Sequence, residues 1–452
     1  MKKMCENITE IFLDEIIKLS EKDLPEHVRV QTKMSIIDYM ACIYLGEYEL
    51  HNETLEYMDM FGQDTGNAPV VGTGRNASTH MAALLNGMNA HVSELDDGHR
   101  YGMLHLAAPV ISTLLAVANE QKLSGEAFLK GIVMGYEAAI RLASAIQPGH
   151  KLKGYHATGT CGTIGAAVGL AIALNYNRDQ LKATISAAAT DAAGLLAAID
   201  DESRLKPYNI GRAAVAAINA AYVGKIGMNG PEDILGGNRG FFKATAKDVK
   251  EQYIRDGFEG SYAIELIYRK PYAACRHCHA AIEAAINVEY LNQISVKSIE
   301  TIKIETYNLA VHGHDHKDVK GPSSAKMSIP YSVAVGVVYG KADYEQFTSD
   351  YIEDSDIIDI MNKIEVLESE ELSALVPEKR GAIATIVADG KSFSHRVDYP
   401  KGEPENPIEI KELEQKYYSL VKASGRDEVM AAAMLESIWN IEDKFAEFMM
   451  RL

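Results

Sequence analysis

The sequence predicts a mainly α fold with two domains. From the N-terminus to about residue 228, Ala, Leu, Ile and Met recur at spacings of three and four residues, which indicates helices. After residue 264 short alternating segments appear, which are typical of strands. The helical spacing returns near the C-terminus. We therefore predict a large all-helical domain formed by both chain ends, residues 1–264 and 401–452, and a smaller α+β domain, residues 265–400.

Helix starts in the first domain are marked by short polar residues. Ser124 precedes GEAFLKGIVMGYEAAIRLASAI and Asn177 precedes RDQLKATISAAATDAAGLLAAI. Such side chains can accept hydrogen bonds from the free N–H groups of a first turn. The segment GTCGTIGAAVGLAIAL is rich in Gly and Ala, so its helix can approach a neighbour closely. We expect tightly packed helices at the centre of this domain.

The predicted α+β domain has two clear strand signals. IETIKIETY alternates, and AIATIVADGKSFSHRVDYP reads as a hairpin whose turn is Asp389-Gly390. Helical segments such as KMSIPYSVAVGVVYG and DSDIIDIMNKI lie between them. The Pro-containing piece YPKGEPENP ends the domain, and the helices that follow are expected to rejoin the first domain.

Composition limits the possible partners and the compartment. The formal net charge of −18 and the absence of a secretory or membrane-spanning pattern argue against nucleic acid and membranes as partners. Five scattered cysteines, Cys5, Cys42, Cys161, Cys275 and Cys278, predict no disulfide framework and fit a reducing compartment. We expect a cytoplasmic protein that binds small molecules or other proteins.

One short stretch concentrates titratable groups between two apolar helices. HVSELDDGHRYGMLH, residues 91–105, contains Glu94, Asp96, Asp97 and three histidines, the last of them His105. An unpaired buried charge costs several kcal/mol, so these groups must be solvated, paired or functional. The stretch is either a solvated loop between helices, with His105 satisfied by a backbone carbonyl, or one wall of an active site.

Three further stretches place polar residues at helix starts. His156 in KGYHATGTCGTIG precedes a Gly/Thr-rich start whose N–H groups could hold a carboxylate, although a structural cap is an alternative. Lys206 in DDESRLKPYNIGRAA is followed by Arg212, and an exposed loop lysine is the alternative. The third stretch is YRKPYAACRHCHAAIEAAI, with Lys270, Arg276, His277 and His279.

Metal ligation has weak support in the sequence. Cys275 and Cys278 form a CxxC pair, but a second pair at zinc spacing is absent, so we predict no zinc site. HGHDHKD, residues 312–318, is either a metal-binding cluster or a solvated loop. The site is expected to work without metal.

Cations at helix starts contrast with the strongly acidic chain as a whole. A pocket built from these lysines, arginines and histidines would bind a polycarboxylate, because backbone dipoles at helix starts also favour anions. Histidine can move protons near neutral pH. Lysine can stabilise the enolate that forms when a proton next to a carboxylate is removed.

Together, these segments resemble the MmgE/PrpD family. The matching motifs are ELDDGH, HLAAPV, GYHATGTCGTIGAA, KPYNIGRAA, KPYAACRHCHAAI and AKMSIPYSVAVGV, in family order over nearly the whole chain. The resemblance implies cofactor-independent enzymes acting on small polycarboxylates, among them 2-methylcitrate dehydratase, cis-aconitate decarboxylase and iminodisuccinate epimerase. It also implies a helical domain made from both chain ends, an α+β lid and a homodimer.

The resemblance assigns roles to individual positions. Its catalytic positions correspond to His105, His156, Lys206, Lys270 and Tyr331. Arg276 is similar to an arginine of the epimerase-like members, which would clamp a substrate carboxylate. We also assign Glu94, Asp97, His277 and His279 to substrate binding, with Glu94 and Asp97 also orienting an imidazole. The chain has Glu94 where the decarboxylases have aspartate, and Gly98 where they have threonine.

The predicted function is therefore a lyase, either a dehydratase or a decarboxylase. It would act on a citrate- or aconitate-like acid by removing a proton next to a carboxylate. An epimerase of a dicarboxylate shares this first step and is the alternative. A non-catalytic protein that binds polycarboxylates is the alternative of another class.

Overall fold

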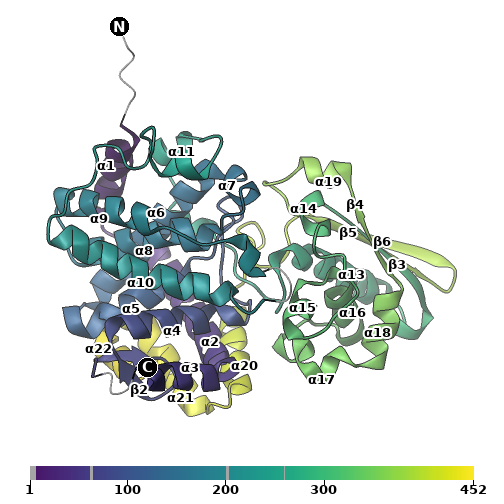
Figure 1. The fold of residues 1–452 in the computed structure, drawn as a ribbon. Coiled ribbons are helices and arrows are strands. Elements are labelled where there is room, and N and C mark those ends of the chain that lie inside the picture. The colour runs from purple at the N-terminus through teal and green to yellow at the C-terminus, as the bar shows by residue number, and fades with distance from the viewer. Residues whose placement is uncertain (1–6, 62–64, 200–202, 259) are drawn as a thin grey trace, which may run out of the picture. The chain divides into compact units, whose positions relative to one another are not determined.

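The computed structural model describes residues 7–61, 65–199, 203–258 and 260–452. The chain divides into two compact units (Figure 1). Unit 1 comprises residues 1–267 and 410–452, and unit 2 comprises residues 268–409. The mainly α fold class is confirmed, since strands form only two small sheets in the described residues.

Unit 1 contains most of the helices and one short hairpin. Its elements are α1 (Ile8–Ser20), α2 (Glu26–Glu49), α3 (His51–Met60), β1 (Ala68–Val70), β2 (Arg75–Ala77), α4 (Thr79–Val92), α5 (Ala107–Gln121), α6 (Gly125–Ile146), α7 (Gly149–Leu152), α8 (Ala157–Ala173), α9 (Arg178–Asp191), η1 (Leu196–Ile199), α10 (Lys206–Lys225), α11 (Phe241–Thr245), α12 (Gln252–Arg255), η2 (Ala263–Leu266), α20 (Ile410–Ala423), α21 (Glu428–Trp439) and α22 (Ile441–Met450). No helix in the described residues is long and apolar enough to cross a membrane.

Helix α8 lies at the centre of unit 1, where it contacts α5, α6, α9 and α10. Its Gly and Ala residues allow this, as the sequence predicts. A Cβ on Gly165 would lie 2.6 Å from the carbonyl oxygen of Gly135 on α6, and one on Gly169 would lie 2.4 Å from that of Gly131. No side chain fits at these positions, so the two helix backbones are in direct contact.

The two predicted caps are confirmed. Ser124 accepts a hydrogen bond from the backbone N–H of Ala127 at the start of α6. Asn177 and Gln180 form a reciprocal capping box at the start of α9. These short-range contacts depend on a few neighbouring residues, which is why the sequence reveals them.

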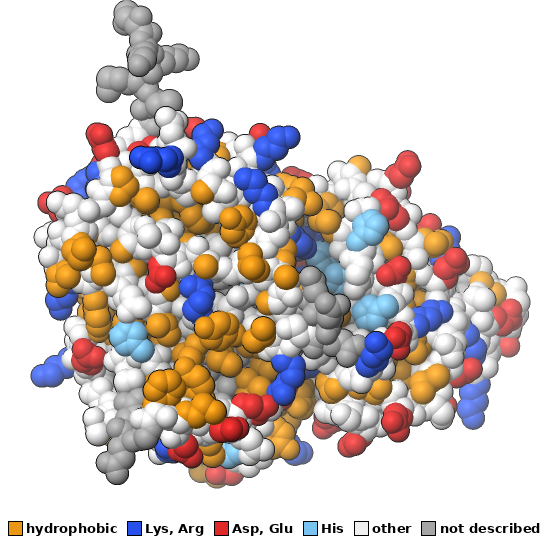
Figure 2. Space-filling model, viewed as in Figure 1, with side chains coloured by type: hydrophobic (Ala, Val, Ile, Leu, Met, Phe, Trp, Pro, Cys, Tyr) orange, Lys and Arg blue, Asp and Glu red, His pale blue; other side chains and the backbone are white. Residues whose placement is uncertain are grey.

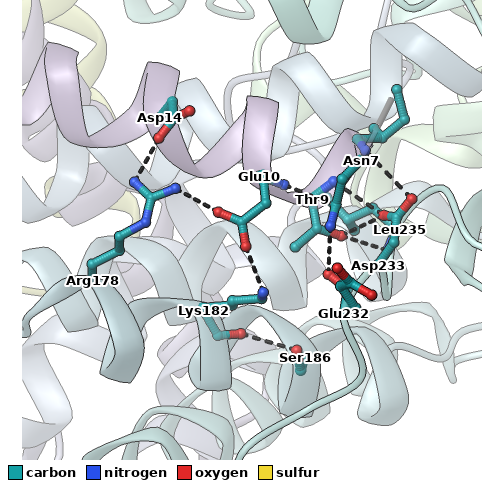
Figure 3. Close-up of polar contacts among 11 residues, drawn as sticks. Asn7, Thr9, Glu10, Asp14, Arg178, Lys182, Ser186, Glu232, Asp233 and Leu235 are labelled. Atoms are coloured by element: carbon teal, nitrogen blue, oxygen red, sulfur yellow. Dashed lines mark hydrogen bonds and ion pairs between the residues drawn. The ribbon is translucent and has the colours of Figure 1, made fainter. Parts of the chain in front are cut away.

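Helix α1 is held by polar contacts to distant segments (Figure 3). Glu10 pairs with both Arg178 and Lys182 of α9. The Asp233 carboxylate accepts hydrogen bonds from the backbone N–H of Thr9 at 3.1 Å and from its hydroxyl at 2.7 Å. The charged side chains of α1 are thus paired on its surface.

The prediction that the first domain is all-helical is wrong in one place. Residues 68–77 form an antiparallel hairpin in which Ala68 pairs with Ala77 and Val70 with Arg75. Each strand has only three residues, too few for a visible alternation in the sequence.

Unit 2 is built around a four-stranded sheet in the order β4-β3-β5-β6. β3 runs parallel to β4 and antiparallel to β5, and β5 and β6 form a hairpin. The elements are η3 (Arg276–Cys278), α13 (His279–Asn292), η4 (Val296–Ser298), β3 (Ile299–Thr306), α14 (Asn308–Val311), α15 (Pro322–Met327), α16 (Ile329–Tyr339), η5 (Tyr344–Phe347), α17 (Ser349–Ile352), α18 (Ser355–Asn362), β4 (Ile364–Glu368), α19 (Glu370–Ala374), β5 (Ala382–Ala388) and β6 (Lys391–Val397).

The predicted hairpin and its turn are confirmed. Asp389 and Gly390 both have positive φ, 50° and 68°, as a two-residue type I′ turn requires. Alternate residues of β5 are buried, and α13 packs against β5 and β6. The apolar side of the hairpin therefore lies beneath this helix.

Residues 401–409 belong to unit 2, whereas the sequence interpretation places them with the helical domain. The backbone N–H of Lys401 donates to Glu283 on α13 at 2.6 Å. The Glu403 carboxylate accepts hydrogen bonds from Arg276. These contacts connect residues more than a hundred positions apart, so local composition does not reveal them.

Candidate active site

The acidic stretch forms a folded loop, residues 93–106, between α4 and α5 of unit 1. Most of its residues are buried. Glu94 and Met103 have φ of 59° and 50°, in the left-handed region that side-chain-bearing residues seldom adopt. The loop is therefore not solvated, and it has a defined conformation that orients its side chains. The other part of that alternative, a His105 satisfied by a backbone carbonyl, is confirmed.

Asp97 fixes this loop to two helices. Its Oδ1 accepts hydrogen bonds from the backbone N–H groups of Leu106 and Ala107, at 3.2 and 3.0 Å, and thereby caps α5. Its Oδ2 accepts one from the Tyr136 hydroxyl at 2.7 Å. Burial raises the pKa of Asp97 to about 6, against the effect of these donors. Asp97 is thus engaged within the protein rather than positioned as the expected substrate ligand.

His105 has a defined tautomer. Its Nδ1 lies 2.7 Å from the carbonyl oxygen of Asp97 and 3.3 Å from Oδ2 of Asp96. Because a carbonyl and a carboxylate only accept hydrogen bonds, Nδ1 must carry the proton. The backbone N–H of His105 donates to the Thr158 hydroxyl at 3.1 Å, which ties it to α8. In neutral His105, Nε2 therefore keeps its lone pair and can act as a base.

Two residues next to His105, Asp96 and His91, are missing from the sequence-predicted site. Nδ1 of His91 lies 2.8 Å from Oδ2 of Asp96, and the His91 and His105 ring centroids are 4.7 Å apart. Burial would raise the pKa of Asp96, but His105 and His91 hold it well below its usual value. Burial lowers the pKa of His91. Asp96 is thus an ionised carboxylate between two imidazoles.

Glu94 and Lys206 form an ion pair beside this cluster. Lys206 is the first residue of α10, and its Nζ donates to Oε1 of Glu94. Both side chains are largely buried, with exposed fractions of 17% and 13%. Arg212, on the same helix, instead donates to backbone carbonyls, including that of Asp191. The predicted alternative of an exposed loop lysine therefore fails for Lys206.

His156 is buried at the start of α8 but does not cap the helix through its side chain. Its Nδ1 lies 3.3 Å from Nδ2 of Asn209, and the same Nδ2 donates to the carbonyl oxygen of Leu195 at 3.1 Å. Nδ1 is thus an acceptor, and Nε2 of neutral His156 carries the proton. Burial and the positive charge of Lys206 hold the pKa of His156 well below its usual value. His156 and His105 therefore have opposite tautomers.

Arg276 and His279 of unit 2 contact each other. Arg276 donates through Nε and Nη2 to Oε1 of Glu403, at 3.1 and 2.7 Å, and through Nη1 to Nδ1 of His279 at 2.8 Å. Nε2 of His279 donates to the carbonyl oxygen of Ala274 at 3.1 Å. The expected carboxylate clamp therefore already holds a carboxylate of the protein, and His279 is satisfied by internal groups.

The remaining predicted residues of unit 2 have different environments. Lys270 is almost fully buried. His277 is partly exposed, and its Nδ1 lies 2.7 Å from the Tyr307 hydroxyl. Tyr331 is buried in α16 and donates its hydroxyl proton to the carbonyl oxygen of Gln346 at 2.7 Å. Burial raises the pKa of Tyr331, so its hydroxyl stays protonated.

The histidines of HGHDHKD have separate partners. Nε2 of His314 lies 3.4 Å from Sγ of Cys275, whereas Nε2 of His316 lies 3.3 Å from the carbonyl oxygen of Ser324. Within the described ranges, Cys42, Cys161, Cys275 and Cys278 form no disulfide, and Cys5 lies outside those ranges. These contacts do not assemble the ligand set that the sequence leaves open.

In the part of the chain that the structure describes, three other side chains lie close enough together to hold a metal ion. The ligand atoms of His91, Asp96 and His105 lie within 4.8 Å of one another. Two neutral imidazoles and a carboxylate suit a divalent transition metal. However, Nδ1 of His91 donates to Oδ2 of Asp96 and Nδ1 of His105 donates to the Asp97 carbonyl oxygen, so hydrogen bonds account for the arrangement without a metal.

Within unit 1 the structure thus brings together Glu94, Asp97, His105, His156 and Lys206, and adds His91, Asp96 and Asn209. Lys270, Arg276, His277, His279 and Tyr331 lie in unit 2. His91 is visible in the sequence as the last histidine of an apolar helix, five residues before Asp96. Asn209 has no comparable signal.

Comparison with known protein families agrees with this organisation. Residues 12–253 match the MmgE/PrpD N-terminal domain, and residues 272–441 match the MmgE/PrpD C-terminal domain. The chain belongs to the MmgE/PrpD family. The second match continues beyond unit 2 into α20 and α21, so the family's sequence domains and the structural units of this MmgE/PrpD protein end at different residues.

Relatives of this MmgE/PrpD protein include two kinds of lyase. A cis-aconitate decarboxylase-like protein of Aspergillus oryzae is 24% identical over 92% of this chain and 91% of its own length. The human cis-aconitate decarboxylase is 22% identical over 92% of this chain and 88% of its own. The 2-methylcitrate dehydratase of Salmonella typhimurium is 26% identical over 51% of this chain and 50% of its own.

Proposed function

We propose that this protein is a cofactor-independent lyase for an aconitate- or citrate-like polycarboxylate. The observation that carries the proposal is the fixed tautomer of His105, whose Nδ1 proton is held by two acceptors while Nε2 is left as a base. The relatives named above act on acids of this class, as their names state. Near neutral pH, an imidazole base is suited to proton transfer.

In a dehydration, Nε2 of His105 removes the proton next to a substrate carboxylate, and the β-hydroxyl leaves with a proton from an acid. Lys206 and the N-terminus of α8 stabilise the negative charge that develops on the carboxylate. His156, with its proton on Nε2, donates a hydrogen bond to the leaving hydroxyl, and the imidazolium formed at His105 supplies the proton with which that hydroxyl leaves as water. In a decarboxylation, the same cations stabilise the carbanion left by CO₂, and His105, which has first taken up a proton from solvent, donates it to that carbon.

Lys206 is paired with Glu94 before substrate binds. A substrate carboxylate would have to displace Glu94 from the ammonium group of Lys206. The Glu94 carboxylate therefore occupies the position at which we expect a substrate carboxylate to bind. We assign Lys270 and His277 to substrate binding as well, because they occupy family motif positions and bear groups that bind carboxylates.

Epimerisation is the second candidate, and the opposite tautomers of His105 and His156 favour it. One imidazole could remove a proton and the other could return one to the opposite face of the same carbon. Purified protein in D₂O with cis-aconitate, citrate, 2-methylcitrate or an aspartate-derived dicarboxylate separates the candidates by NMR. A new unsaturated or decarboxylated product indicates a lyase, inversion without elimination indicates an epimerase, and binding without turnover indicates a binding protein.

Turnover is expected to survive exhaustive chelation. The reason is that protons already satisfy the His91–Asp96–His105 group, so the proposed steps use only side chains of the chain. The measurement is kcat/KM after dialysis against EDTA, with the metal content checked by mass spectrometry. Activity that disappears and returns only with added metal would contradict the cofactor-free mechanism.

We also propose a homodimer formed through the face of unit 1 that carries α10. Large apolar side chains are exposed along this helix and next to it, namely Leu195, Leu205, Tyr208, Ile226 and Met228. Hydrophobic side chains gather in patches on the visible face of unit 1 (Figure 2). Exposed apolar patches of this kind suit contact with a second copy of the chain.

Light scattering at micromolar concentration should give about twice the chain mass of 49.5 kDa. Ile226→Glu with Met228→Glu should shift the protein towards monomer, because two buried carboxylates would be unpaired. Val429→Glu, at an equally exposed apolar position on α21, is the matched control and should remain dimeric. A wild-type monomer would rule out this assembly.

A further inference from the structure

The Asp96 carboxylate uses its two oxygens unequally. Oδ2 accepts a hydrogen bond from Nδ1 of His91 at 2.8 Å and lies 3.3 Å from Nδ1 of His105, which donates its proton to the Asp97 carbonyl oxygen at 2.7 Å. Oδ1 is buried and has no hydrogen-bond partner among the described residues. His91 is fully buried, whereas His105 retains 13% exposure. One carboxylate oxygen thus connects an inner imidazole to an outer one.

We propose that Asp96 is the positioning residue of the site and that it couples His91 to His105. Starting from two neutral imidazoles, the pair then takes up one proton and not two. This role rests on the proposed function, in which His105 is the base. Asp96 and His91 touch no reacting atom in this scheme. They act through His105.

The Asp97 carbonyl alone can set the tautomer of His105, so Asp96 must contribute something else. It contributes a negative charge next to the ring that becomes imidazolium when Nε2 takes a proton. A carboxylate hydrogen-bonded to the opposite ring nitrogen stabilises that cation, as in other carboxylate–imidazole pairs. Asp96 therefore stabilises the imidazolium that His105 forms during proton transfer.

His91 weakens the stabilisation that Asp96 gives to the His105 imidazolium. As a neutral donor to the same oxygen, it shares the charge that would otherwise act on His105 alone. A second imidazolium with its centroid 4.7 Å from the first would be repelled, and one carboxylate cannot neutralise both. The pair therefore takes up one proton, and protonation of one ring opposes protonation of the other.

The surrounding charges are already paired. Glu94 binds Lys206, and Lys416 on α20 donates to Asp38 on α2 at 2.6 Å. The Asp97 carboxylate has three donors. The titratable and charged groups around the pair are Asp38, Glu94, Asp97, His156, Lys206 and Lys416. Asp96 is thus the carboxylate whose hydrogen-bond donors are imidazoles alone.

The first test needs no substrate. Histidine labelled with ¹⁵N on both ring nitrogens reports each tautomer by NMR, and His91→Gln and His105→Gln identify the two sets of signals. Both rings are expected to carry the proton on Nδ1 in the neutral wild-type protein. In Asp96→Ala, His91 should leave that tautomer, because its Nδ1 loses its acceptor, whereas the Asp97 carbonyl keeps the proton of His105 on Nδ1. An unchanged His91 tautomer in Asp96→Ala would overturn the proposal.

The second test is the pH profile of kcat/KM. Asp96→Asn should lower kcat by about 10²–10⁴-fold with little change in KM, and should move the acidic limb to lower pH, because the imidazolium loses its partner charge. His91→Leu should move the same limb to higher pH, because the carboxylate then acts on His105 alone. A purely structural role would reduce stability and move neither limb.

Asp233→Asn provides the matched control. Asp233 is also a hydrogen-bonded carboxylate, but it holds α1 (Figure 3). Its loss should lower the melting temperature without moving the pH profile. If no polycarboxylate is turned over, the proposed function fails while the NMR test still decides the tautomers. Stoichiometric Zn²⁺ binding that is required for turnover would instead make the three residues ligands and overturn the proposal.

Discussion

Replacing His105 by glutamine is expected to lower kcat by about 10²–10⁴-fold while leaving KM nearly unchanged. Glutamine can still donate to the acceptors that hold Nδ1, the Asp97 carbonyl and Asp96, but it has no basic nitrogen in place of Nε2. The loss should therefore affect proton transfer and not the structure of the loop. Steady-state kinetics and the melting temperature measure the two effects separately.

Hydrogen exchange gives the sharper readout of the same change. In D₂O the wild-type protein should introduce deuterium next to a carboxylate in recovered substrate or product, and His105→Gln should not. His80→Gln is the control, since His80 is exposed on α4 and contacts Asn219. If exchange continues undiminished in both His105→Gln and His156→Gln, neither imidazole is the base, and Glu94 becomes the candidate.

Lys206→Met is expected to lower kcat/KM by about 10²–10³-fold. Truncating one partner of a buried charge pair typically costs 2–5 kcal/mol, partly because the other charge is left alone. In Lys206→Met the charge left without its partner is the Glu94 carboxylate, which would also repel a substrate carboxylate. The measurement is kcat/KM together with the binding of a non-reactive tricarboxylate.

A double variant separates these two causes. Glu94→Gln combined with Lys206→Met removes the unpaired carboxylate, so it should recover part of the binding but not the stabilisation of developing charge. Lys182→Met is the matched control, because Lys182 also pairs with a glutamate, Glu10, but on the α1–α9 surface (Figure 3). Full recovery of kcat/KM in the double variant would show that Lys206 only neutralises Glu94.

Much of the fold could be predicted because its signals are local. Helix periodicity, the Ser124 and Asn177 caps and the Asp389-Gly390 turn each depend on a few consecutive residues. The β1–β2 hairpin escaped prediction because three-residue strands give no period. The C-terminal limit of unit 2 was not predicted correctly, because contacts between residues far apart in the sequence decide it.

The sequence determined which chemical groups this protein has: an acidic loop with histidines, and lysines at helix starts in an acidic chain. The tertiary structure decided which of them meet. Lys206 reaches Glu94 across 112 positions, and Arg276 is neutralised by Glu403 across 127. Of the two neighbouring aspartates, Asp97 caps a helix while Asp96 holds two imidazoles. Local patterns cannot separate such roles, because the partner of a buried charge is chosen by packing between distant segments, where desolvation makes pairing obligatory.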